Sequence, residues 1–155
     1  DEGVEFFKRF LPQSRLIYLI RNPLERLKSQ LRMNANRGKK LPSSPKEWEA
    51  LLDMPALRTR GDYLNNVPRW SARFTDDQLL YLPYGQIGKD PLSLLRKIEH
   101  HCDLASSEYP QAAERVHQTA PLQLPDYVIE RLEELAAPQA AFLRSHFGES
   151  FYQDT

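Results

Sequence analysis

Hydrophobic positions along the chain follow two spacings, one typical of buried strands and one typical of amphipathic helices. Two short apolar runs, RLIYLI at 15–20 and QLLYLPY at 78–84, are compact and rich in branched or aromatic residues, which favours strands. Elsewhere apolar residues recur every three or four positions, which predicts helices. These helices are expected at 2–11, 23–36, 45–52, 61–74, 90–102, 126–137 and 138–147. The pattern therefore predicts an α/β protein that is mostly helical and has two parallel strands.

Two parallel strands do not make a stable sheet without neighbours. If the run at 15–20 is buried on both faces, further parallel strands must pair with its edges, and the sequence does not contain them. We therefore expect residues 1–155 to form a single partial domain. A missing N-terminal segment or a partner chain would complete its sheet.

Composition narrows the classes of function that fit this domain. The chain has 155 residues, and 21 Lys and Arg balance 21 Asp and Glu, so no global positive field exists to hold nucleic acid. Any anion site must therefore be local. No apolar run approaches the roughly 20 residues of a membrane span. Residues 1–8 do not have the pattern of a signal peptide, so we expect no membrane span and a cytoplasmic location.

Two further segments carry residues that can bind ions, a His-His-Cys run and a basic loop. His100, His101 and Cys102 are consecutive, and consecutive helix residues point about 100° apart, so they cannot converge on one ion and we expect no metal. Residues 37–45 (RGKKLPSSP) are basic and rich in Pro and Ser, which predicts a flexible basic loop.

The strongest chemical signal is R-N-P-x-x-R-x-x-S, which begins at Arg21 and ends at Ser29, directly after the first predicted strand. Asn22 can cap the following helix, and Pro23 suits its first turn. The planar fork of Arg21 can bind a phosphate with two hydrogen bonds, and Ser29 offers a hydroxyl nearby. The start of the helix adds free N–H groups and the positive end of its dipole. The motif therefore predicts a phosphate site at this turn.

Residues 18–30, YLIRNPLERLKSQ, resemble the 3'-phosphate-binding motif of sulfotransferases that use PAPS (3'-phosphoadenosine 5'-phosphosulfate). The resemblance implies that Arg21 and Ser29 bind the 3'-phosphate of PAPS or of its product PAP. It also implies that the chain is the C-terminal portion of a sulfotransferase and forms a partial P-loop-NTPase-like fold. The complete enzyme would transfer a sulfuryl group to a hydroxyl or amine. Further stretches are similar to the carbohydrate-type enzymes, which favours a glycan acceptor. They are Gly61-Asp62-Tyr63, Trp70, Phe74, the second strand, Asp90-Pro91 and the ending with Phe142, Leu143, Gly148 and Phe151.

The sequence also departs from the family pattern. Tyr84-Gly85 stands where the family usually has Tyr-Glu. The family's N-terminal strand, its Gly-rich 5'-phosphosulfate loop with a lysine, and the base that activates the acceptor are not found, so the catalytic residues are unknown and we expect this chain alone to be inactive. The alternative is an inactive nucleotide- or phosphate-binding remnant that serves as an interaction module. A nucleotide kinase-like domain is disfavoured, because the glycines of Gly85–Lys89 are separated by two residues instead of four.

Overall fold

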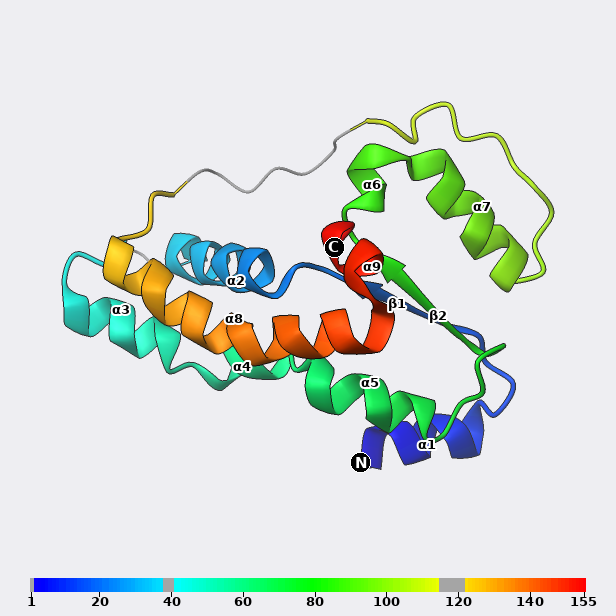
Figure 1. Cartoon of the computed structure of the whole chain (residues 1–155), viewed down its shortest axis with the longest axis horizontal. Helices are drawn as coiled ribbons and strands as arrows, with labels where there is room; N and C mark the ends of the chain where they lie inside the picture. The colour runs from blue at the N-terminus through cyan, green and yellow to red at the C-terminus, as the bar shows by residue number, and fades with distance from the viewer. Residues whose placement is uncertain (1, 38–40, 115–121) are drawn as a thin grey trace.

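The computed structural model describes residues 2–37, 41–114 and 122–155, and two parallel strands lie among helices within them (Figure 1). The strands are β1 (Leu16–Ile20) and β2 (Leu79–Pro83). The helices are α1 (Glu2–Phe10), α2 (Pro23–Arg37), α3 (Pro45–Leu52), α4 (Pro55–Thr59), α5 (Tyr63–Ser71), α6 (Gln86–Lys89), α7 (Pro91–His101), α8 (Asp126–Phe147) and α9 (Glu149–Gln153). The predicted class, mostly helical with two parallel strands, is confirmed.

The two strands pair in parallel from Leu16 opposite Leu79 to Ile20 opposite Pro83, so their carboxyl ends lie at the same edge. One face of the sheet is covered by α5, α8 and α9, with fully buried Ile20 and Val67 in the contact. This packing fixes the end of β1, where the chain turns into α2.

A second core holds α2, α3, α4 and α8 together, away from the sheet (Figure 1). Leu31 of α2, Leu57 of α4 and Leu132 of α8 are fully buried there. The long helix α8 therefore belongs to both cores, because its first half packs on α2 and its Leu143 packs beneath β1.

The sequence suggested that residues 15–20 are buried on both faces, but the structure buries them on only one face. Leu16, Tyr18 and Ile20 face the helices, whereas Ile17 and Leu19 point to the opposite face and are 38% and 43% exposed. The helices that contact β1 lie on the first face, which leaves the second face of β1 apolar and open.

The helix predictions need three corrections. The segments predicted at 126–137 and 138–147 form one helix, α8, because buried residues on both sides of Pro138 hold it together despite the missing N–H. Within the predicted range 61–74 the observed helix is α5, which ends at Ser71. The short helix α4 lies before this range and was not predicted. In α7 the helical spacing of Leu92, Leu95 and Ile98 predicts a buried stripe, but the buried positions are Leu94 and Glu99, and Leu92 is exposed.

The predicted flexible loop at 37–45 is described only in part, because residues 38–40 lie outside the described residues. Its last residues cap the N-terminus of α3. The Ser44 hydroxyl accepts from the backbone N–H of Glu47, and the Glu47 carboxylate accepts from the backbone N–H groups of Ser43 and Ser44. This reciprocal capping box satisfies donors that would otherwise lack partners.

Candidate functional site

The turn from β1 into α2 lies at the carboxyl edge of the sheet, where open α/β sheets bind ligands. Asn22 caps α2 as expected, because its Oδ1 accepts from the backbone N–H groups of Leu24 at 3.1 Å and Glu25 at 3.3 Å. Pro23 is the first residue of the helix and is buried. The cap fixes the direction in which α2 leaves the sheet and thus the direction of its dipole.

Arg21 is held through its backbone, which leaves its side chain available. Its N–H donates to the hydroxyl oxygen of Tyr63 at 3.2 Å, and burial raises the pKa of that phenol, so Tyr63 stays neutral. The Arg21 guanidinium lies over the ring of Tyr84, with its central carbon 5.1 Å from the ring centre. No carboxylate pairs with this guanidinium in the part of the chain that the structure describes. Its donors can therefore bind an anion.

Ser29 is half-buried on α2 and follows Asn22 by seven residues. Seven residues are close to two helical turns, so both side chains leave the same side of α2, about 10 Å apart along its axis. The structure gives no hydrogen bond between the described side chains of Arg21 and Ser29. Ser29 therefore lies on the Asn22 side of α2.

Arg26, the third polar residue of the motif, has a structural contact that the sequence did not reveal. The neighbouring carboxylate of Glu25 pairs with Lys28 at 3.1 Å and not with Arg26. Arg26 donates from Nη2 to the backbone carbonyl of Leu57 at 2.9 Å, and burial lowers its pKa. A Cβ on Gly61 would lie 2.1 Å from Arg26 Nε, so Gly61 leaves the space that the guanidinium occupies.

This contact explains the spacing of Gly61 and Tyr63. Gly61 accommodates Arg26 of α2, and Tyr63, two residues later, accepts from Arg21. The Gly-x-Tyr segment therefore contacts both Arg21, two residues before α2, and Arg26, the fourth residue of α2. The sequence shows the Arg21–Ser29 motif and the Gly61–Tyr63 segment as two separate motifs. Only the folded structure shows that they contact each other.

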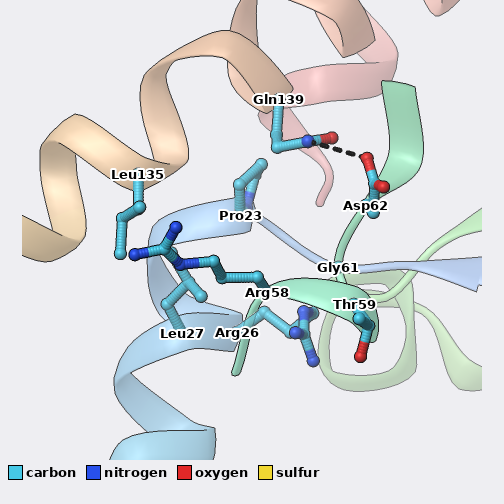
Figure 2. Close-up of a pocket in the computed structure, with 9 residues that line it drawn as sticks. All are labelled: Pro23, Arg26, Leu27, Arg58, Thr59, Gly61, Asp62, Leu135 and Gln139. Carbon is cyan, nitrogen blue, oxygen red and sulfur yellow. Dashed lines mark hydrogen bonds between the residues drawn. The ribbon is translucent and has the colours of Figure 1, made fainter. Parts of the chain in front are cut away.

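A cavity of about 290 Å³ opens beside the first turns of α2 (Figure 2). The Arg58 side chain extends across it toward Leu135, and Gln139 donates to Asp62 at 3.2 Å on its far side. Its other lining residues are Pro23, Arg26, Leu27, Thr59 and Gly61. Neither Arg21 nor Ser29 lines this cavity, so it is separate from the side of α2 where the motif predicts an anion.

Two other expectations concern metal ions and membranes. Within residues 2–37, 41–114 and 122–155, no three His, Cys, Asp or Glu side chains gather in a way that could hold a metal ion. Among the helices of the same ranges, none has the length and apolar character needed to cross a membrane.

Comparisons with known proteins give a match to one family model and a likeness of fold to a solved structure. Residues 2–108 match the model of the family described as "Sulfotransferase family". Among solved structures, a sulfotransferase from Alicyclobacillus acidocaldarius superposes with a TM-score of 0.66 at 19% sequence identity. The match covers 92% of this chain and 57% of that chain, so this chain spans little more than half the length of the solved protein. No curated protein matches the sequence.

Proposed function

Because the chain belongs to the sulfotransferase family, we propose that it binds the 3'-phosphate end of PAPS or PAP with Arg21 and Ser29. The complete enzyme would transfer the sulfuryl group of PAPS to a hydroxyl or amine. No metal takes part in this proposal. Which residues carry the chemistry stays unknown, and a cytoplasmic location stays a prediction.

The observation that carries the proposal is the Arg21 guanidinium at the capped start of α2, which no carboxylate of the described residues pairs with. A 3'-phosphate there would meet the guanidinium fork of Arg21 and the positive end of the α2 dipole. Ser29, on the Asn22 side of the helix, would add a hydrogen bond from a neutral donor. Together these groups would offer a phosphate positive charge, hydrogen-bond donors and a favourable helix dipole.

Sulfuryl transfer resembles phosphoryl transfer, because positioning and electrostatic stabilisation supply most of the rate. Binding of the nucleotide end at Arg21 would anchor the donor while its sulfuryl group reacts elsewhere. The acceptor is proposed to be a glycan, because the succession Gly61, Tyr63, Trp70 and Phe74 resembles that of carbohydrate-type enzymes.

Calorimetry of the full-length protein with PAP and with AMP, which lacks the 3'-phosphate, tests the proposal. A hydrogen bond to a charged group contributes about 1.5 to 3 kcal/mol, so Arg21→Ala should weaken PAP binding by at least about tenfold. Ser29→Ala removes a hydrogen bond from a neutral donor and should cost less than Arg21→Ala, which also removes a positive charge. Arg58→Ala is the matched control, because Arg58 lines the separate cavity.

The nucleotide comparison decides the result. Both motif variants should weaken PAP binding much more than AMP binding, and Arg58→Ala should leave the ratio of the two affinities unchanged. Equal losses for PAP and AMP would overturn the assignment. Intact PAP binding without sulfuryl transfer to any hydroxyl or amine acceptor would instead favour the inactive nucleotide-binding module.

A further inference from the structure

The C-terminal residues lie against the ends of both strands, beside the candidate phosphate site (Figure 1). Gly148 ends α8 with a positive φ of 88°, and the chain then turns into α9. The Asn22 side-chain amide donates from Nδ2 to the hydroxyl of Tyr152 at 3.2 Å. The backbone N–H of Gly85 donates to the carbonyl of Asp154 at 2.9 Å. The last turn of the chain thus contacts the turn after β1 and the turn after β2.

We propose that Tyr152 is a positioning residue for the phosphate turn and acts through Asn22. The inference rests on the proposed function, because the turn that Tyr152 holds is the turn that would receive the 3'-phosphate. Tyr152 itself need not touch the nucleotide. Its role would be to keep Asn22, and with it the neighbouring Arg21, in the geometry that receives the phosphate.

The first reason is the orientation of the Asn22 amide. Its Oδ1 accepts from the N–H groups of Leu24 and Glu25, so Nδ2 must point the opposite way and needs a partner of its own. The Tyr152 hydroxyl is that partner. The N–H groups of Leu24 and Glu25 set this orientation, because a flipped amide would point its NH₂ donors at them. The Tyr152 hydroxyl supplies the acceptor that Nδ2 needs in this orientation.

The second reason is that the Tyr152 ring is itself fixed. The Arg144 guanidinium lies 4.0 Å from the ring centre, and Arg144 also pairs with Glu149 at 3.1 Å. A hydroxyl on a fixed ring can hold Asn22, whereas a hydroxyl on a freely moving tail could not.

The third reason is a glycine that makes room for the tail. A Cβ on Gly85 would lie 2.4 Å from the backbone carbonyl oxygen of Asp154, so only glycine allows this approach. Lys89 then pairs with the Asp154 carboxylate at 2.7 Å. The Gly85 that departs from the family's Tyr-Glu pattern is therefore the residue that admits the C-terminal segment to the sheet edge.

Tyr152→Phe in the full-length protein tests the proposal, because it removes the hydroxyl and keeps the ring that Arg144 covers. PAP affinity should fall roughly three- to tenfold while AMP affinity is retained. Amide hydrogen exchange of Leu24 and Glu25, measured without nucleotide, should become faster by a similar factor. Tyr109→Phe is the matched control, because its hydroxyl donates to Glu99 at 2.9 Å and has no contact with Asn22. Tyr109→Phe should change neither the PAP affinity nor the amide exchange of Leu24 and Glu25.

A double-mutant cycle separates positioning through Asn22 from a general effect on stability. Asn22→Ser keeps a capping oxygen but has no amide to reach Tyr152, so Tyr152→Phe should cost nothing further in that background. Equal costs of Tyr152→Phe in both backgrounds, or unchanged exchange at Leu24 and Glu25, would overturn the proposal. If the wild-type protein bound PAP and AMP equally, the proposed function would fail, and the exchange and the cycle, measured on stability, would still decide whether Tyr152 holds this turn.

Discussion

Gly61→Ala should destabilise the protein through Arg26, although Gly61 has an ordinary backbone conformation that alanine can adopt. The new Cβ would lie 2.1 Å from Arg26 Nε and 2.9 Å from Nη2, so the guanidinium must leave its place. It would lose the bond to the Leu57 carbonyl, on a residue that is fully buried. A hydrogen bond to a charged group contributes about 1.5 to 3 kcal/mol, and we expect a loss of stability in that range.

Urea unfolding followed by tryptophan fluorescence measures this loss. The same Gly61→Ala change is then measured in an Arg26→Ala protein, which lacks the guanidinium. Without the guanidinium, the Cβ at Gly61 has room, and Gly61→Ala should become neutral or stabilising by about 0.4 to 1 kcal/mol through the unfolded chain. Gly88→Ala is the control, because nothing lies within 4 Å of its added Cβ. An equal loss from Gly61→Ala with and without Arg26 would refute the reasoning.

Two further predictions concern the stability of the chain. Arg96, Ser107 and Tyr109 donate to the buried carboxylate of Glu99 and lower its pKa from 4.5 to about 2. A lowered carboxyl pKa stabilises the fold above the unfolded value, and the effect is lost as the pH falls. Urea unfolding of Glu99→Gln should therefore show a deficit against wild type at pH 7 that shrinks between pH 4.5 and 2; a constant deficit would contradict this assignment. Residues 1–155 alone should form a marginal domain that binds a hydrophobic dye, because Ile17 and Leu19 leave one face of β1 apolar and open. A partner strand should stabilise it, whereas cooperative unfolding of a monomer at high temperature would argue against a partial domain.

The sequence was most informative where the signal is local. The strands and the Asn22 cap follow from short patterns of apolar and capping residues. Contacts between distant segments could not be predicted in this way. Arg26 meets Gly61 across 35 positions, and Asn22 meets Tyr152 across 130. Each depends on how α2, α5 and α9 pack, which no local pattern encodes. The continuous α8 was missed for the same reason, because burial on both sides outweighs the cost of Pro138.

Amide chemical shifts of the full-length protein, compared between saturating PAP and saturating AMP, test the central claim most directly. The two nucleotides differ at the 3'-phosphate, so the difference between their shift changes marks where that group binds. The account predicts that the largest differences fall on Arg21, on Leu24 and Glu25 at the start of α2, and on Ser29. Differences centred instead on Arg58 and Gln139, around the cavity of Figure 2, would contradict it.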